Sequence, residues 1–365
     1  MNISHRPTLQ SFDYISFILM ISISLYGLLF IFSSTYSYEK PLSSFFIKQA
    51  LGLCCSIIIY CMCLIPDYRN LMRWGHVAYY AVVILLITTL IKGSIGMGGK
   101  RWINIIIFKF QPSELAKLFF PTYIVNYLHT YKKFVVYSFT LFIPIIAMIG
   151  ITFFLIYKQP DLGTALICLF SGFLICWLGG LPKKFFVYST ITLAIMTPVI
   201  WNCALRDYQK NRIIVFFGQG NSKKEGYQIE QAHIAIGSGG IWGKGLLKGT
   251  QNKLQFLPES RTDFIFAVVC EEWGLIGALI LLSLYALLFL RSFLIINTFK
   301  DPYAQLLASG LILHILLATI INIGMVLGML PIVGIPLPLL SYGLSNLWIT
   351  YACFGILQNI IIHCR

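Results

Sequence analysis

The sequence YQIEQAHIAIGSGGIWGKGLLKGTQNKLQFLPESRTDFIFAVVCEEWG, residues 227–274, is a long polar and glycine-rich segment in a largely apolar chain. It holds five of the 13 Asp and Glu residues of the protein, namely Glu230, Glu259, Asp263, Glu271 and Glu272. Asp263 stands where the polar stretch passes into the apolar run FIFAVV, so we expect its carboxylate at a membrane boundary. A carboxylate in that position can take part in chemistry.

The composition of the 365 residues indicates a membrane protein. Hydrophobic residues make up 58% of the chain and charged residues 11%, and the mean hydropathy is +0.80. These values predict a polytopic membrane protein and exclude an ordinary soluble domain. The net charge of +14 is explained by cytoplasmic loops that face anionic lipid, or in part by an anionic substrate. We expect no nucleic-acid partner.

The cysteines indicate neither a disulfide framework nor a metal site. Most of the 10 cysteines lie inside apolar runs, where they act as small buried hydrophobes. No C-x-x-C pair occurs, so we predict neither zinc nor redox chemistry. Arg6 precedes an apolar segment that lacks a small-residue cleavage site, which indicates a first transmembrane helix and not a cleaved signal.

Successive apolar runs predict the fold. They lie near residues 13–34, 45–66, 75–92, 113–131, 135–157, 162–180, 185–204, 264–290, 303–329 and 342–362. At about 20 residues per crossing, they predict an all-α polytopic protein with about ten transmembrane helices. We expect one integral membrane domain over residues 1–365, with a long external loop at about 205–262 between spans seven and eight.

The distribution of cations predicts the orientation. Lys and Arg residues occupy the two ends of the chain and every second connection, at Arg6, Arg69, Arg73, Lys132, Lys133, Lys183, Lys184, Arg291, Lys300 and Arg365. By the positive-inside rule these parts are cytoplasmic, including both termini. The 205–262 segment is then external, and its length indicates an ordered, functional loop packed on the membrane face.

Three cations do not fit this rule. Lys100, Arg101 and Lys109 lie in the connection 93–112, which the same count places outside. They are candidates for binding a negatively charged group. Alternatively, they are residues at helix ends whose charged heads reach out to water.

Three further ionisable residues lie in or beside the predicted spans. Glu114 and Lys117 are three residues apart, on one face of a helix, where they can pair. The pair serves either function or helix packing alone, since a neutralised pair is far cheaper in lipid than a lone charge. Asp161 opens the sixth span, where capping of the helix is its simplest role.

The glycine-rich sequence IAIGSGGIWGKG, residues 234–245, does not form a nucleotide-binding motif. A Walker A loop needs Gly in place of Ser238 and Ser or Thr in place of Gly245. The glycines instead favour tight turns and close backbone approach, and a backbone cradle for phosphate is an alternative.

Five blocks of sequence resemble the SEDS family of bacterial cell-wall proteins, in the order of that family. The blocks are GKRWINIIIFKFQPSELAKL (99–118), QPDLGTALI (159–167), GYQIEQAHIAIGSGGIWGKGLLKGTQ (226–251), FLPESRTDFIFAVVCEEWGLIG (256–277) and NIGMVLGMLPIVGIPLPLLSYG (322–343). The likeness is strongest to the members that act in cell elongation. It implies a ten-span peptidoglycan glycosyltransferase that polymerises lipid II at the outer leaflet of the bacterial cytoplasmic (inner) membrane. It also implies a class B penicillin-binding protein transpeptidase and other elongation-complex proteins as partners.

The resemblance also implies roles for single residues. The catalytic aspartate of the family matches Asp263, its intramembrane ion pair matches Glu114 and Lys117, and Asp161 matches another family carboxylate. The chain departs from the family pattern at four places, which are Arg261 for His, Lys109 for Arg, FFGQGNSKKEG (216–226) for an FLDP-type segment, and SYGLSNL (341–347) for SYGGSSL.

The chemistry expected of such an enzyme assigns these residues their tasks. A sugar hydroxyl must attack an anomeric carbon that carries a lipid diphosphate, and a general base such as Asp263 assists by removing the hydroxyl proton. Lys100, Arg101, Lys109 and Lys117 are candidate partners of the diphosphate. A divalent cation, Mg²⁺ or Mn²⁺, could share that task, although no ligand cluster specifies one, and no organic cofactor is expected. A lipid II flippase and a non-catalytic scaffold of the elongation machinery are the alternative functions.

Overall fold

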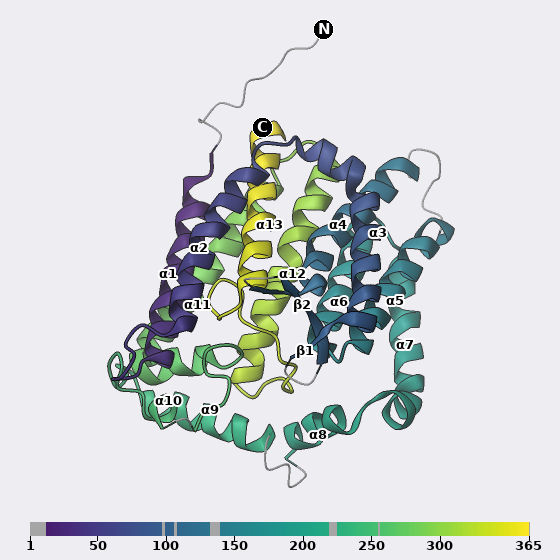
Figure 1. Ribbon diagram of the computed structural model, residues 1–365. Helices are drawn as coiled ribbons and strands as arrows, with labels where there is room; N and C mark the ends of the chain where they lie inside the picture. Colours follow the sequence, from purple (N-terminus) through teal and green to yellow (C-terminus); the bar gives the residue numbers. More distant parts are fainter. Residues whose placement is uncertain are drawn as a thin grey trace.

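The computed structural model describes residues 12–96, 99–105, 108–131, 139–218, 225–254 and 256–364, and only the backbone at 95, 96, 104, 105, 108, 109, 200, 204, 225 and 252. Long helices stand side by side in a bundle, and shorter helices cross one end of it (Figure 1). The α-helices are α1 (Tyr14–Thr35), α2 (Ser44–Cys63), α3 (Tyr68–Lys92), α4 (Pro112–Tyr131), α5 (Ile143–Lys158), α6 (Leu162–Leu178), α7 (Lys183–Val199), α8 (Asp207–Phe216), α9 (Glu225–Gly239), α10 (Thr250–Lys253), α11 (Ile265–Ile296), α12 (Pro302–Val326) and α13 (Leu344–Cys364). A 3₁₀ turn η2 (Phe139–Phe142) precedes α5, and a π turn η3 (Ile200–Ala204) follows α7.

Seven helical segments are long and apolar enough to cross a membrane, which supports a multi-pass membrane protein. They are α1, α2, α3, the continuous segment 139–158, α11, α12 and α13. Each predicted apolar run carries a helix, but α6 and α7 have only 17 residues each. In α4, polar residues such as Glu114 and Lys117 lower the mean hydropathy. The number of ten spans therefore stays a prediction.

The prediction of an all-α fold is wrong between α3 and α4. That connection forms a three-stranded antiparallel sheet of β1 (Ser94–Gly96), β2 (Gly99–Ile105) and β3 (Phe108–Phe110). In the register, Ile95 lies opposite Lys100 and Ile103 opposite Phe110. Isoleucine and aromatic residues dominate this short segment, and they favour extended strands. A search for membrane-length runs does not detect strands of this size.

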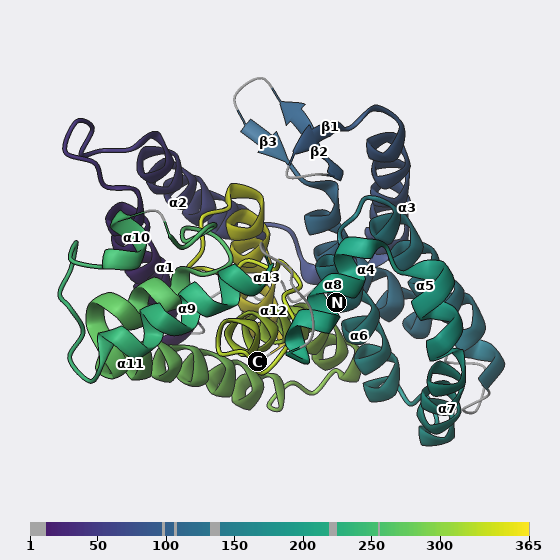
Figure 2. The same cartoon turned by 90° about the horizontal axis from the view of Figure 1, so that it is seen from below.

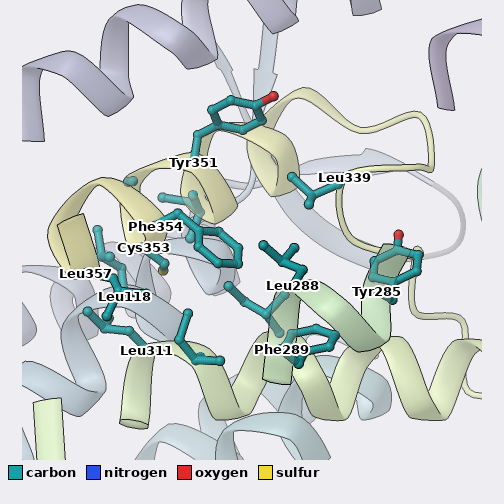
Figure 3. Packing of buried hydrophobic residues seen from close by; sticks show 14 of the residues in the cluster. Leu118, Tyr285, Leu288, Phe289, Leu311, Leu339, Tyr351, Cys353, Phe354 and Leu357 are labelled. Atoms are coloured by element: carbon teal, nitrogen blue, oxygen red, sulfur yellow. The ribbon is translucent and has the colours of Figure 1, made fainter. Parts of the chain in front are cut away.

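The centre of the bundle is formed by α12 and α13. In their apolar stretches 61% and 78% of the residues are buried, against 28% in α2 and in α3. Figure 3 shows the packing at the centre, where Leu118 of α4 and Leu311 of α12 lie near Cys353 and Leu357 of α13. Polar side chains on these helices are therefore enclosed by protein.

The start of α1 lies beside the ends of α11 and α13. The Arg291 Nη2 atom of α11 is 3.0 Å from Oδ1 of Asp13, the residue that precedes α1. The backbone N–H of Asp13 donates to Gln358 of α13 at 3.1 Å. Helices α8, α9 and α10 lie at the opposite end of the bundle (Figure 1).

A kink at Gly274 connects α11 to the polar segment. Gly274 has φ 64° and ψ −158°, a conformation that glycine adopts without strain. Backbone hydrogen bonds join the glycine-rich segment to α11 before and after the kink. The N–H of Lys244 donates to Glu271 O at 3.0 Å, and the N–H of Leu275 donates to Gly240 O at 2.9 Å. The glycine-rich sequence thus provides a turn and close backbone contact, as predicted.

Two buried carboxylates anchor the same segment. Glu271 Oε1 accepts from Lys244 Nζ and from the Thr250 N–H, both at 2.7 Å. Glu272 Oε2 accepts from Ser33 Oγ of α1 at 2.7 Å. Helix α9 packs along α11 (Figure 2). The described part of the 205–262 segment is therefore helical and packed, as expected of an ordered loop, whereas its external location stays a prediction.

Candidate active site

Asp263 lies in a tight turn directly before α11. The N–H groups of Thr262 and Phe264 both donate to Glu259 O, at 3.1 and 3.3 Å. Glu259 has φ 53°, a left-handed conformation that is strained for a non-glycine residue and that clusters at functional sites. From α12, Asn322 Nδ2 donates to Asp263 O at 2.9 Å. The backbone of Asp263 is therefore held from two sides.

The Asp263 side chain lies among charges from several distant segments. It keeps partial exposure, and no donor in the described part of the chain hydrogen-bonds to its carboxylate. Burial, and then the negative charge of Glu259, raise its pKa to about 7, while Arg212 of α8 and Arg101 of β2 oppose the rise and Asp161 adds to it. The pKa is thus close to neutral pH, the range in which a carboxylate can both take up and release a proton.

Asp161 caps α6 and holds Arg101. Its Oδ1 accepts from the Thr164 N–H at 3.3 Å, so the predicted cap is confirmed. Its Oδ2 accepts from Gln111 Nε2 at 2.8 Å. The Nη1 of Arg101 is 3.8 Å from Asp161 Oδ1. This contact fixes a cation of the sheet close to Asp263.

The other two cations of the 93–112 connection differ from Arg101. The side chain of Lys100 is exposed and forms no ion pair within the described ranges. The side chain of Lys109 lies outside the described part of the structure. Of the two side chains that the structure describes among these three residues, that of Arg101 acts on Asp263, and a role for Lys100 and Lys109 stays a prediction.

Glu114 and Lys117 form the ion pair that their spacing predicts. Lys117 Nζ is 2.7 Å from Glu114 Oε2, and each side chain is 5% exposed. Asn346 Nδ2 of α13 donates to the same oxygen at 3.2 Å. The pair is enclosed between α4 and α13, so the positive charge of Lys117 is already neutralised by Glu114.

The sequence analysis missed four residues of the site, namely Arg212, Glu259, Asn322 and Gly334. Arg212 is the most informative, because it carries a positive charge from α8 into the surroundings of Asp263. Tyr208 stands four residues earlier, and the Arg212 guanidinium carbon is 5.6 Å from its ring centre. An aromatic residue and a cation four apart on a helix predict a contact between the two side chains, and this pattern distinguishes Arg212 from the other charged residues of the segment.

Two departures from the family pattern contact the site without blocking it. The Arg261 guanidinium lies over the Phe45 ring, with 3.9 Å from its carbon to the ring centre. Arg212 and Arg101 are the cations that oppose the rise in the Asp263 pKa. In SYGLSNL, Ser341 Oγ donates to Thr262 O at 2.6 Å, and Asn346 contacts Glu114.

The described residues do not fit a resident metal ion. They include no group of three or more His, Cys, Asp or Glu side chains that could hold one. The carboxylates of Asp263 and Glu259 come with Arg212 and Arg101, and such cations disfavour a second cation nearby.

The chain is similar to known proteins along nearly its whole length. The family model FTSW_RODA_SPOVE, described as "Cell cycle protein", matches residues 13–365. The peptidoglycan glycosyltransferase MrdB of Escherichia coli K12 is 38% identical, over 86% of this chain and 84% of that protein. MrdB of Helicobacter pylori 26695 is 36% identical, over 96% and 90%.

Solved structures show the same architecture. Rod shape determining protein RodA of Thermus thermophilus superposes with a TM-score of 0.72 at 25% identity, over 97% of both chains. A chain from a peptidoglycan synthase complex that coordinates polymerization and crosslinking superposes with a TM-score of 0.81 at 25% identity, over 96% of this chain and 97% of that one.

We predict that Glu114 and Lys117 stabilise the fold only as a pair. Glu114→Leu or Lys117→Met alone leaves a buried charge without its partner, and each should lower the free energy of unfolding by about 3–5 kcal/mol. The double variant should lose less than the sum of the two. Thermal unfolding of the purified protein measures this, with exposed Lys92→Met as a control. Losses that simply add would show that the two residues do not interact.

Proposed function

This chain belongs to the FtsW/RodA/SpoVE family, and on that premise we propose that it polymerises lipid II into glycan strands for cell elongation and rod-shape maintenance. It is a peptidoglycan glycosyltransferase, the activity for which its MrdB and RodA relatives are named. The observation that carries the reaction is Asp263, a carboxylate with a pKa of about 7 beside two guanidinium groups.

Asp263 is the general base in this proposal. A sugar hydroxyl of one lipid-linked chain attacks the anomeric carbon of another, and its proton passes to Asp263. The new carbon–oxygen bond forms as the bond from that carbon to the lipid diphosphate breaks. A positioned base typically contributes about 10²–10⁴ to such a rate. The absence of a hydrogen-bond donor to this carboxylate within the described residues leaves its lone pairs free for the incoming proton.

Arg101 assists the departure of the lipid diphosphate. Negative charge grows on the diphosphate as it leaves, and a fixed cation stabilises that charge. Arg101 is held by Asp161 within 3.8 Å and contributes to the potential at Asp263. Lys100 and Lys109 are further cations that could meet the same group. Glu114 and Lys117 give structural support by holding α4 against α13.

The charged site favours catalysis over lipid transport or scaffolding. A lipid II flippase would need charged groups and a groove, and a scaffold would need only spans and loops. Neither requires a carboxylate whose pKa is tuned to about 7. Formation of polymer by the purified chain separates catalysis from both alternatives.

The proposal includes partners, a cation and a location. We infer that a class B penicillin-binding protein transpeptidase cross-links the new strand, together with other elongation-complex proteins, and a neighbour from a peptidoglycan synthase complex supports this inference. Mg²⁺ or Mn²⁺ would have to arrive with the substrate diphosphate, since its phosphate oxygens supply ligands that the described residues do not. The protein would lie in the bacterial inner membrane with both termini cytoplasmic and α8–α10 outside.

The orientation can be tested with single cysteines in a chain whose native cysteines are replaced. Trp242→Cys, at a residue 81% exposed beside α9, should react with an impermeant thiol reagent added outside intact spheroplasts. Ile65→Cys, at a residue 82% exposed between α2 and α3, is the matched control and should react only after lysis. The reverse pattern would overturn the orientation.

Asp263→Asn should abolish polymerisation from purified lipid II. Asn keeps the shape of the side chain, and no hydrogen bond to the carboxylate is lost among the described residues, but it does not accept the proton at neutral pH. We expect a rate at least about 10²-fold lower, with unchanged expression and partner binding. Asp207→Asn, exposed at the start of α8, is the control. Substantial polymer from the purified Asp263→Asn protein would show that Asp263 is not the base.

The dependence of kcat on pH also tests whether Asp263 is the general base. Asp263 acts only when deprotonated, so kcat should rise with pH, reach half its maximum near the pKa of about 7, and stay high above it. Glu259→Gln removes a negative charge that raises this pKa and should move the acid limb to lower pH. A limb that stays in place in Glu259→Gln would mean that another group limits the rate.

A further inference from the structure

Gly334 lies beside both Asp263 and Arg212. A Cβ atom at Gly334 would be 3.5 Å from Asp263 Oδ2 and 3.9 Å from Arg212 Nη1. Gly334 has φ 77°, which few other residues adopt without strain. The carboxylate and the guanidinium therefore approach the same glycine, where the positive φ and not a steric clash disfavours a side chain.

Arg212 is held in place but not neutralised. Its Nη1 donates to Ile332 O at 3.2 Å, and the Tyr208 ring lies beside the guanidinium. Its Nε is buried and has no hydrogen-bond partner. No carboxylate within the described ranges comes within ion-pair distance of Arg212, whereas Arg101 is already paired with Asp161. A fixed guanidinium with unused donors is suited to an anion, above all to a phosphate group that it can bind through two hydrogen bonds.

We propose that Arg212 binds the diphosphate of the lipid-linked sugar donor beside Asp263, and that Gly334 supplies a backbone without a side chain at the position that both groups approach. This inference rests on the proposed function. Arg212 thereby becomes a substrate-binding residue carried by α8, outside the membrane-length helices.

The reaction requires a base and a cation on different sides of the same carbon. The acceptor hydroxyl approaches from the side of Asp263, to which its proton passes. The bond between the anomeric carbon and the diphosphate oxygen breaks on the far side, and its electron pair stays on the diphosphate. Arg212 approaches Gly334 from α8, while Asp263 approaches it from the turn before α11. Because both side chains approach Gly334, one bound donor can meet Arg212 through its diphosphate while Asp263 takes the proton of the acceptor hydroxyl.

Binding of polyprenyl diphosphate to the full-length purified protein tests the proposal without turnover. Polyprenyl monophosphate is the parallel probe, because it shares the lipid and lacks the second phosphate. Arg212→Gln should weaken diphosphate binding at least about tenfold, the loss expected for a charge-assisted pair, and should weaken monophosphate binding less. The matched control is Arg206→Gln, which removes an exposed cation just before the same helix. Equal diphosphate affinity in the Arg212→Gln, Arg206→Gln and unchanged proteins would overturn the proposal.

Arg212→Lys and Gly334→Ala complete the test, with thermal melting to verify folding. Arg212→Lys keeps the positive charge but cannot form a bidentate contact with phosphate. Its diphosphate affinity should therefore fall between those of Arg212→Gln and the unchanged protein. If Arg212→Gln does not fold, unchanged diphosphate affinity in Arg212→Lys overturns the proposal. Folded Gly334→Ala should polymerise lipid II more slowly, and an unchanged rate would contradict the role of Gly334.

A failure of the Arg212 assignment can be distinguished from a failure of the proposed function. If the unchanged protein makes no polymer with its transpeptidase partner present, the proposed function fails, and diphosphate binding still decides the role of Arg212. If the unchanged protein makes polymer and Arg212→Gln binds diphosphate normally, only the assignment of Arg212 fails.

Discussion

The cost of burying a charge in an apolar bundle governs this structure. Glu114 is neutralised by Lys117, Glu271 by Lys244 and backbone amides, and Asp161 by Arg101 and the start of α6. Each buried charge is neutralised in this way, because a buried charge without a partner is strongly destabilising. Asn346, Lys244 and Arg101 also connect these carboxylates to other elements. Asp263 differs, since among the described residues nothing donates to its carboxylate. Its pKa rises instead, and that is the property a general base needs.

The site depends on how the polar segment is attached to the bundle. The kink at Gly274 lets the backbone around 240–245 pair with α11. Glu271 and Glu272 then tie this segment to α10 and α1. These contacts fix the segment at the end of the bundle opposite to the start of α1. Helix α8, which belongs to the same long connection, is held by the bond from Arg212 to Ile332 O, so a surface element contributes a cation to the site.

The site also joins opposing charges from four separate parts of the chain. Glu259 and Asp161 raise the pKa of Asp263, and Arg212 and Arg101 lower it, so the value near 7 is a balance. Removing any one charge should shift that balance in a known direction. The arrangement places cations next to a base without neutralising it, and this suits a reaction that takes up a proton and releases a diphosphate.

Composition and local pattern by themselves determined the membrane class, the helical runs, the Glu114–Lys117 pair and the cap at Asp161, because each depends on neighbours close in sequence. The five family-like blocks also led to Asp263 through the resemblance. The sheet at 94–110 was missed because its strands are too short to register beside membrane-length runs. The Tyr208–Arg212 spacing signals an aromatic–cation contact but does not show that Arg212 approaches Asp263, and local pattern assigns no role to Glu259 or Gly334. The place of Glu259 depends on its left-handed turn, and the meeting of Arg212 and Gly334 with Asp263 depends on packing between segments distant in the sequence. Only the tertiary structure decides such contacts.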